Sequence, residues 1–418
     1  MKSTRLHVLR FTALVYFLLV ASLGFSQVYH VATLPALKGK PNVKHPNLAY
    51  GINNAGQVTG FSISDAVTWT PGNGIQDFGE DNCWVCNPVG GINNAGDVTG
   101  LLVDEGFVWT ASGGIQILGS YVQPTGINNS VMVTGVYNVG AGTDAFWWTP
   151  QEPSLHDLGS FGGSETWAFG INDAGQIVGF SEDASYNTIP FLWSESTGLQ
   201  PISSPFVAAY SINNQGQVAG ILQSGDQYHA ALWTESGGAQ DLGLLPGTSF
   251  SGAVSVNNHG VAVGNSWSAG PPGSVFLWSP SQGMLNVNAL ANNSKENWTV
   301  IGINDASQIV VDRKGGNLQL LTPLVAVSLT SSPNPSQLGQ TVTFTATASS
   351  IAGPPPDGEI VTFRDSGTIL GTVPLAGGVA QLSSSNLAAG THRISAIYAG
   401  DINYASRKSN IIKQVVNR

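Results

Sequence analysis

Charged residues and sulfur are scarce in this chain. Asp, Glu, Lys and Arg make up only 10% of its 418 residues, and 25 acidic against 15 basic residues give a net charge of −10. Binding to nucleic acid depends on clustered Lys and Arg, so this balance argues against a nucleic-acid partner. Hydrophobic residues nevertheless make up 42% of the chain, which is enough for a sizeable core and argues against a disordered protein.

Cysteine occurs only at Cys83 and Cys86. In an exported protein this pair predicts a small disulfide-closed loop, and two unpaired thiols are the alternative. A redox motif would need a helix beginning at Cys83, whereas the flanking Asn and Pro residues are typical of a loop. A structural zinc site needs about four ligands, and the sequence contains no second Cys or His pair to complete one.

Long apolar runs are also rare, and the one that stands out lies at the N-terminus. Three basic residues among the first ten precede a run from Phe11 to Phe25. This order of charge and apolar residues predicts a signal peptide over residues 1–26, cut before Gln27. An uncleaved anchor, which needs about twenty apolar residues, is the alternative. We expect a secreted protein, extracellular or at the cell surface, with no membrane span after signal removal.

What the chain does have is glycine, proline and an internal repeat. Its 52 Gly and 22 Pro residues suit many short strands joined by tight turns. The segment GINNAGQVTG at residues 51–60 returns almost unchanged at residues 91–100, and weaker copies follow. Together they define seven units of about forty residues. The Ile or Val that precedes the Asn in each unit is Ile52, Ile92, Ile127, Ile171, Ile212, Val256 or Ile303.

Six of the seven units carry four strand signals. The Asn-Asn-Ala-Gly segment predicts a type I turn with a Gly bulge, and therefore a hairpin formed by the first two strands. The third strand is an apolar run that ends in Trp, and a shorter fourth strand follows. A strand that is apolar on both faces lies between sheets, so we expect these Trp side chains to pack between neighbouring sheets, with ligand stacking as the alternative. The structural repeat Trp residues are Trp69, Trp109, Trp148, Trp193, Trp233 and Trp278.

Four short strands in about forty residues correspond to one blade of a β-propeller, and a solenoid is the alternative. The seventh unit lacks its fourth strand, because Pro323 is followed directly by different sequence. An unpartnered strand at residues 29–34 precedes the first unit. We therefore predict an all-β protein with a seven-bladed β-propeller over residues 27–323, closed by this N-terminal strand, since closure removes exposed sheet edges.

The repeat resembles the extracellular HAF-repeat family over residues 28–323. That family pairs the GINN hairpin with a strand similar to HAFLW, which occurs here as DAFWW at residues 144–148 and HAALW at residues 229–233. The resemblance implies export and a repeat fold, but no particular chemistry. Val131 and Ser307 stand where the turn glycine belongs, so we expect the third and seventh hairpins to be altered or looser.

The forty-residue rhythm stops at Pro323. Residues 324–418 contain no Trp or Cys and carry seven short strand signals, which predicts an immunoglobulin-like β-sandwich. The segments LTSSPNP at residues 329–335 and GQTVTF at residues 339–344 resemble bacterial immunoglobulin-like repeat domains of large surface proteins. That resemblance implies a spacer or adhesion role.

No set of residues predicts a catalytic site, and we expect no cofactor. Calcium held by the carbonyl groups of the Asn-rich turns is a weaker alternative, and the histidines, including His156, His229 and His259, show no metal spacing. Four Trp residues outside the repeat position are candidates for exposed ligand contacts. These are Trp84, Trp167, Trp267 and Trp298.

The sequence therefore predicts a secreted, non-catalytic binding, adhesion or surface scaffold protein. Loops of the propeller would present the binding face, and the immunoglobulin-like domain would act as a spacer. The expected partner is an extracellular polysaccharide or a surface protein. The alternatives are a propeller enzyme acting on glycans and a purely structural envelope component.

Overall fold

The computed structural model describes most of the chain after the predicted signal peptide. The described residues are 28–36, 48–62, 65–80, 90–102, 104–140, 142–268, 273–293, 296–313, 317–401 and 403–418. The predicted signal peptide, the Cys83–Cys86 pair and Trp84 lie outside these residues. Within them the chain is almost entirely β-strand, with one short helix, α2 (Val287–Leu290).

The described chain divides into two compact units, which we name the repeat unit and the C-terminal unit. The repeat unit consists of Val31–Ala289 and Asn293–Leu321. The C-terminal unit consists mainly of Thr322–Arg418, joined by the described residues up to His30 and by Leu290–Asn292.

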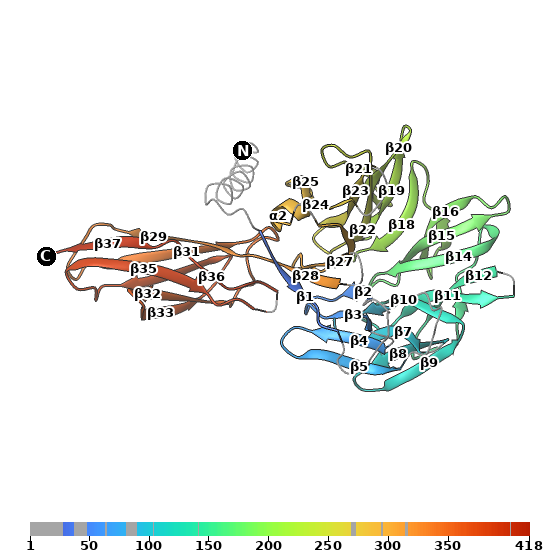
Figure 1. Ribbon diagram of the computed structural model, residues 1–418, viewed down its shortest axis with the longest axis horizontal. Helices are drawn as coiled ribbons and strands as arrows, with labels where there is room; N and C mark the ends of the chain where they lie inside the picture. The colour runs from blue at the N-terminus through green and yellow to red at the C-terminus, as the bar shows by residue number, and fades with distance from the viewer. Residues whose placement is uncertain are drawn as a thin grey trace. The chain divides into compact units, whose positions relative to one another are not determined.

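The sheets of the repeat unit follow the sequence repeat (Figure 1). Each repeat forms an antiparallel sheet in which neighbouring strands follow one another along the chain, because tight turns join them. In the first four repeats the strands are β2 (Leu48–Ile52), β3 (Val58–Ser62), β4 (Asp65–Thr70), β5 (Gly74–Glu80); β6 (Gly91–Ile92), β7 (Val98–Leu102), β8 (Glu105–Thr110), β9 (Gly114–Ser120); β10 (Val122–Ile127), β11 (Val133–Val139), β12 (Gly142–Trp148), β13 (His156–Asp157); and β14 (Gly162–Ile171), β15 (Ile177–Asp183), β16 (Thr188–Ser194), β17 (Gly198–Pro201).

The later repeats continue this pattern. A parallel pair, Thr143 with Glu165, links the sheets of the third and fourth repeats. The remaining strands are β18 (Phe206–Ile212), β19 (Val218–Ser224), β20 (Gln227–Thr234), β21 (Gly238–Gly243); β22 (Phe250–Val256), β23 (Ala262–Trp267), β24 (Ser274–Ser279), β25 (Gly283–Asn286); and β26 (Trp298–Ile303), β27 (Ile309–Arg313), β28 (Asn317–Pro323).

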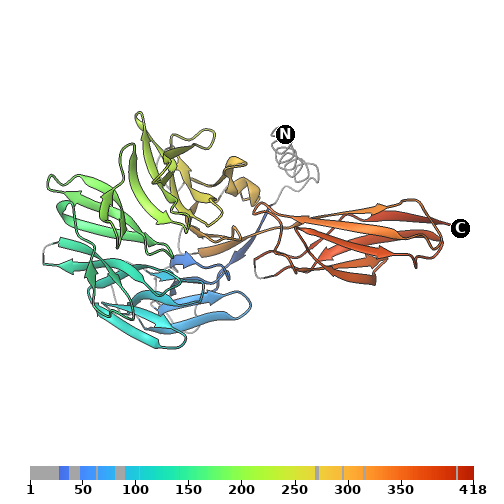
Figure 2. The same ribbon diagram turned by 180° about the vertical axis from the view of Figure 1, so that it is seen from behind.

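The last repeat takes its fourth strand from the start of the chain. Its sheet has the order β1-β28-β27-β26, in which β1 is Tyr29–Thr33. Both views of the molecule place β1 beside β28 (Figure 2), and the Leu34 amide donates to the Leu318 carbonyl oxygen at 2.9 Å. Strands from opposite ends of this unit therefore complete one sheet, and the unit is a β-propeller.

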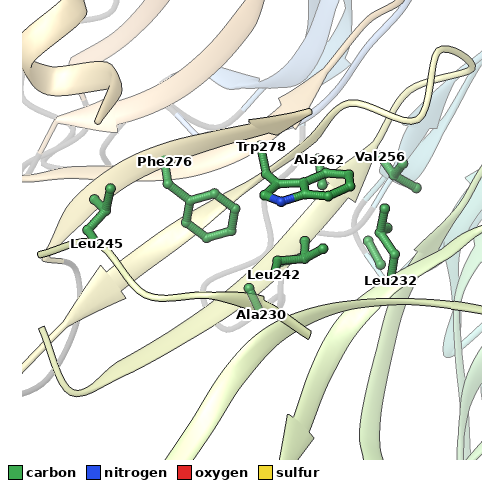
Figure 3. Packing of buried hydrophobic residues seen from close by; sticks show 10 residues of the cluster. Ala230, Leu232, Leu242, Leu245, Val256, Ala262, Phe276 and Trp278 are labelled. Atoms are coloured by element: carbon green, nitrogen blue, oxygen red, sulfur yellow. The ribbon is translucent and has the colours of Figure 1, made fainter. Parts of the chain in front are cut away.

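Apolar side chains hold successive sheets together. One cluster joins β20 and β21 to β22–β24 of the next repeat, with Trp278 and Phe276 packed against Leu232 and Leu242 (Figure 3). Among the repeat tryptophans, Trp69, Trp148, Trp193 and Trp278 are buried, whereas Trp109 and Trp233 are partly buried. Sheet-to-sheet burial of such rings, at about 25 cal/mol per Å², is a main source of the stability of this fold.

The C-terminal unit has the two-sheet arrangement of an immunoglobulin-like domain. One sheet has the order β29-β31-β34, the other β30-β37-β35-β32-β33, with β36 paired to β35. Phe344, Phe363 and Tyr398 are fully buried in its core. The strands are β29 (Ala326–Ser332), β30 (Ser336–Gln337), β31 (Val342–Ser349), β32 (Ile360–Asp365), β33 (Thr368–Pro374), β34 (Val379–Ser384), β35 (Gly390–Tyr398), β36 (Arg407–Lys408) and β37 (Ile412–Asn417).

The expectation of altered third and seventh hairpins is wrong. Val131 and Ser307 adopt φ of 61° and 56°, the same left-handed region as Gly56 at 69°. Their amides also donate to the turn Asn carbonyl oxygens at 3.1 and 2.9 Å, close to the 3.0 Å at Gly56. The surrounding hydrogen bonds therefore impose the turn geometry on residues that disfavour it.

Candidate binding site in the channel

The Asn of each turn organises its own hairpin. Asn213 shows the pattern: its Oδ1 accepts from the amides of Gln215 at 3.1 Å and Gln217 at 2.9 Å. The side chain thereby fixes the turn locally, as short polar side chains do. This Asn is buried in every repeat, at 3 to 5% exposure.

The same Asn also reaches the next repeat. Its Nδ2 donates to the carbonyl oxygen of the corresponding Asn one repeat further along, at 2.8 to 3.1 Å. The last member, Asn304, donates to the carbonyl oxygen of Asn53, so the chain of hydrogen bonds is closed. We call this set the inner Asn ring: Asn53, Asn93, Asn128, Asn172, Asn213, Asn257 and Asn304.

A second closed ring lies one residue further along each turn. Each backbone amide donates to the side-chain Oδ1 of its counterpart in the next repeat, at 2.8 to 2.9 Å. Two members are carboxylates: Asp173 accepts from the amide groups of both neighbouring side chains, and so does Asp305. The outer ring is Asn54, Asn94, Asn129, Asp173, Asn214, Asn258 and Asp305.

The two rings surround a narrow cavity of about 150 Å³ at one end of the central channel of the propeller. The Ile or Val before each inner Asn also lines this cavity. Four of these residues also line a second, wider cavity: Ile52, Ile171, Ile212 and Ile303. The Ile/Val ring is therefore the boundary between a polar end and a wider end, which we call the chamber.

Bulges in the innermost strands direct side chains into the chamber. In the described inner strands other than the two-residue β6, the pairing register shifts two residues before the repeat Ile or Val. A bulge bends a strand and changes the direction of a side chain. The bulge residues that line the chamber are Tyr50, Phe169, Tyr210, Val254 and Ile301.

The chamber has the size and surface of a ligand-binding pocket. Its volume is about 560 Å³, within the range of roughly 300–1,000 Å³ that is typical of such sites. Ser211, Ser255 and Thr299 add hydroxyl groups to the apolar wall, and none of the described lining residues is charged. Burial raises the pKa of the Tyr210 phenol, so this group remains a neutral hydrogen-bonding hydroxyl.

Aromatic rings continue from the chamber along β14 and β15. Phe169 lies 6.1 Å from the Tyr210 ring and 5.8 Å from the Phe180 ring. Trp167 follows, nearly parallel to Phe180 at 6.4 Å, with an interplanar angle of 13°. We call Trp167, Phe169, Phe180 and Tyr210 the aromatic strip; the first three are half-buried and Tyr210 is 37% exposed.

Carboxylates lie beside the outer end of the aromatic strip. The Trp167 indole Nε1 donates to Glu165 Oε2 at 3.2 Å. Glu182 Oε2 accepts from the Ser164 hydroxyl at 3.3 Å. The strip therefore combines aromatic faces with acceptors of hydrogen bonds, and of these residues only Trp167 was predicted from the sequence as a ligand contact.

The other Trp candidates differ from one another. Trp267 is half-buried and stacks on Phe250 at 6.3 Å. The expected exposure of Trp298 is wrong: its ring is fully buried, because it occupies the first inner-strand position of β26 and its Nε1 donates to Gln319 Oε1 at 2.8 Å. Ligand contact by Trp167 or Trp267 stays a prediction.

Two histidines of the repeat unit contact neighbouring side chains closely. His229 Nδ1 lies 2.8 Å from Asp241 Oδ2, and His156 stacks on Trp147 at 4.0 Å. No three His, Cys, Asp or Glu side chains among the described residues come together as metal ligands. In the outer ring the Oδ1 atoms already accept backbone amides, and calcium binding at these turns stays a prediction.

Comparison with known proteins supports the two fold assignments. Residues 329–417 match the family model of the bacterial Ig-like domain (group 3). Among curated proteins the chain has no match. None of the helices formed by the described residues is long and apolar enough to cross a membrane.

Solved structures resemble the chain in fold. A catalytically inactive virginiamycin B lyase from Staphylococcus aureus, with quinupristin, has a TM-score of 0.50 at 12% identity, over 70% of this chain and 99% of that chain. The extracellular domain of a one component system from B. thetaiotaomicron has a TM-score of 0.46 at 9% identity, over 93% and 58%. TolB from Acinetobacter baumannii has a TM-score of 0.37 at 11% identity, over 68% and 65%. At 12% identity the likeness to the lyase concerns the fold alone: a β-propeller, followed here by a bacterial Ig-like domain.

Proposed function

We propose that this chain is an exported, non-catalytic binding protein whose binding site is the chamber of a seven-bladed β-propeller. The propeller spans residues 27–323 and consists of HAF-type repeats. The immunoglobulin-like domain, residues 324–418, is a spacer that presents it. The observation that carries the proposal is the chamber itself, a pocket of about 560 Å³ walled by side chains that bulges turn inward.

The two Asn rings support a binding role because they make the scaffold rigid. Each inner Asn connects neighbouring repeats through hydrogen bonds of 2.8 to 3.1 Å, and the circuit closes from Asn304 to Asn53. A rigid wall loses little conformational entropy when a ligand binds, which favours affinity. The partner is an extracellular polysaccharide or a surface protein, and the net charge of −10 makes nucleic acid an unsuitable one.

The test is to narrow the chamber without disturbing the fold. Val254→Trp places a large ring at a bulge position where other repeats already carry Tyr50, Phe169 and Tyr210. The mature chain and this variant are compared on arrays of bacterial and plant polysaccharides and of surface-protein peptides. We expect a ligand of the mature chain to be lost in Val254→Trp and kept in Tyr186→Ala, whose side chain is 73% exposed. Equal binding by both variants would refute the chamber as the site.

A further inference from the structure

Five of the residues that line the chamber occupy one structural position, the bulge, and the residue type at this position differs from repeat to repeat. The positions after it in each repeat are nearly constant: Gly or Ser, then Ile or Val, then the inner Asn. The bulge position itself varies from no side chain to a large aromatic ring. Around the ring it is Tyr50, Gly90, Thr125, Phe169, Tyr210, Val254 and Ile301. A varied position that faces the chamber, followed by nearly constant positions in the turn, is the pattern of a specificity-determining set on a constant scaffold.

This variation makes the chamber asymmetric. Phe169 and Tyr210 come from adjacent repeats, and their rings lie 6.1 Å apart at an angle of 46°. In contrast, Gly90 has no side chain, and the Thr125 hydroxyl is engaged with the Ala168 carbonyl oxygen at 2.8 Å. The aromatic strip thus begins at one side of the chamber and leads outward along β14 and β15.

We propose that the chamber and the aromatic strip bind the end of an uncharged saccharide chain. This inference rests on the proposed function and names the ligand class of the same site. The terminal sugar occupies the chamber against Phe169 and Tyr210, and the sugars that follow lie along Phe180 and Trp167.

The chemistry of the wall favours an uncharged ligand. A charged group that enters the chamber loses its hydration and meets no described side chain of opposite charge, which costs free energy. Aromatic faces carry negative partial charge and attract the C–H groups on the flat side of a sugar ring. Ser211, Ser255 and Thr299 supply hydroxyl groups that exchange hydrogen bonds with sugar hydroxyls.

The carboxylates of the strip also favour an uncharged saccharide over a charged one. Glu165 has an oxygen atom beside the Trp167 ring, where it accepts hydrogen bonds from sugar hydroxyls, and Glu182 lies two residues beyond Phe180 on β15. Their negative charge also disfavours acidic polysaccharides. A basic peptide is the competing ligand for a strip that combines carboxylates with aromatic rings; it is disfavoured because the chamber at the end of the strip lacks charge.

The Ile/Val ring explains why the chamber would bind the end of a saccharide chain rather than its middle. It borders the chamber on the inside, and the separate cavity beyond it, between the Asn rings, is smaller, at about 150 Å³. A polymer bound through its middle would have to bend into and out of one opening, whereas an end fits directly.

The first experiment uses calorimetry to measure the affinity of the mature full chain for neutral gluco-, manno-, galacto- and xylo-oligosaccharides. For the series that binds, Phe169→Ala and Tyr210→Ala each weaken affinity about tenfold or more, the scale of a buried aromatic contact. Trp167→Ala weakens only the longer oligosaccharides. The control Tyr228→Ala removes a ring that is 45% exposed on β20 and leaves affinity unchanged.

The second experiment distinguishes chain ends from chain interiors. The parent polymer is saturated with protein before and after brief cleavage by an endo-acting hydrolase. We expect the amount of bound protein to rise with the number of chain ends; a constant amount per mass of polymer would overturn end binding.

The remaining outcomes separate this inference from the proposed function. If no neutral oligosaccharide binds but a basic peptide does, and Val254→Trp abolishes that binding, the saccharide inference is wrong and the chamber remains the binding site. If Val254→Trp changes the binding of no ligand on the arrays, both proposals are wrong.

Discussion

Replacing one inner Asn tests whether the closed hydrogen-bond ring stabilises the repeat unit. Asn213→Ala removes four hydrogen bonds, because Oδ1 accepts from the Gln215 and Gln217 amides while Nδ2 donates to Asn257 O at 2.8 Å and Gln217 Oε1 at 2.7 Å. The side chain is 4% exposed, so water does not readily replace these partners.

The magnitude follows from these contacts. A buried hydrogen bond contributes about 0.5–1.5 kcal/mol net, and a buried donor left without a partner costs about 1–3 kcal/mol. The Gln215 and Gln217 amides lose their acceptor, whereas Asn257 O still accepts from the Gly260 amide at 3.1 Å. We therefore expect Asn213→Ala to lower the free energy of unfolding by about 3–5 kcal/mol.

The assay is urea denaturation of the mature chain, followed by Trp fluorescence, which reports on the repeat unit because residues 324–418 contain no Trp. Asn214→Ala is the matched control: its side chain is exposed, and it donates to Asp173 and accepts the Asp173 amide at the surface. Exposed polar contacts contribute less, so we expect a loss of about 1 kcal/mol or below.

A third variant separates the donor from the acceptor. Asn213→Asp keeps the oxygen that closes the turn but faces the Asn257 carbonyl oxygen with a carboxylate. We expect it to be less stable at pH 7 than at about pH 4, because burial favours its protonated form. If Asn213→Ala loses less than about 1 kcal/mol, or no more than the control, the ring does not stabilise the fold as argued.

Two further predictions concern strain and pH. Val131→Gly relieves the strain of a φ of 61° and should raise the free energy of unfolding by about 0.5–1 kcal/mol. The reciprocal Gly175→Val should lower it, because Gly175 has a φ of 72° and the added Cβ would lie only 3.3 Å from Met132 Sδ. The same urea titration measures both variants, and effects of the same sign would show that backbone strain does not decide stability here. His392 is held by the Ala388 carbonyl oxygen and by Asp365, which raise its pKa, so its contribution to the stability of the C-terminal unit is complete below about pH 6.5 and is lost as pH rises through the raised value. Protection factors for hydrogen exchange of β35 in the full chain, which correct for the intrinsic rise of amide exchange with pH, should therefore fall above this pH. His392→Gln should remove this fall, and an unchanged profile would refute the role of His392.

Much of the fold follows from local rules. Asn53 and Gly56 predict a turn because an Asn side chain reaches its own backbone and glycine tolerates a positive φ. The Trp at the end of each third strand lies in a run that is apolar on both faces, which predicts packing between sheets. Trp278 lies in such a cluster.

The candidate site follows less directly. The sequence singled out Trp167 but not Phe169 or Tyr210, because a bulge depends on how two strands pair and leaves no residue type of its own in the sequence. The prediction for Trp298 was wrong for a related reason: the partner of its indole Nε1, Gln319, lies two strands away in the same sheet, and the local sequence does not show this contact.

The sequence by itself determined the repeat, its turns and strands, and the change of domain after Pro323, since these depend on side chains interacting with their own or adjacent backbone. Only the tertiary structure decided that each inner Asn bonds to a carbonyl about forty residues along the chain, that Asn304 bonds to Asn53, and that the bulge residues face one chamber. The bond from Asn304 to Asn53 exists only once the first and last repeats meet, and the other Asn bonds exist only once neighbouring repeats pack together. The hydrogen bonds of its turn, in which Asn128 also bonds to Asn172 of the next repeat, hold Val131 in a conformation that its own side chain disfavours.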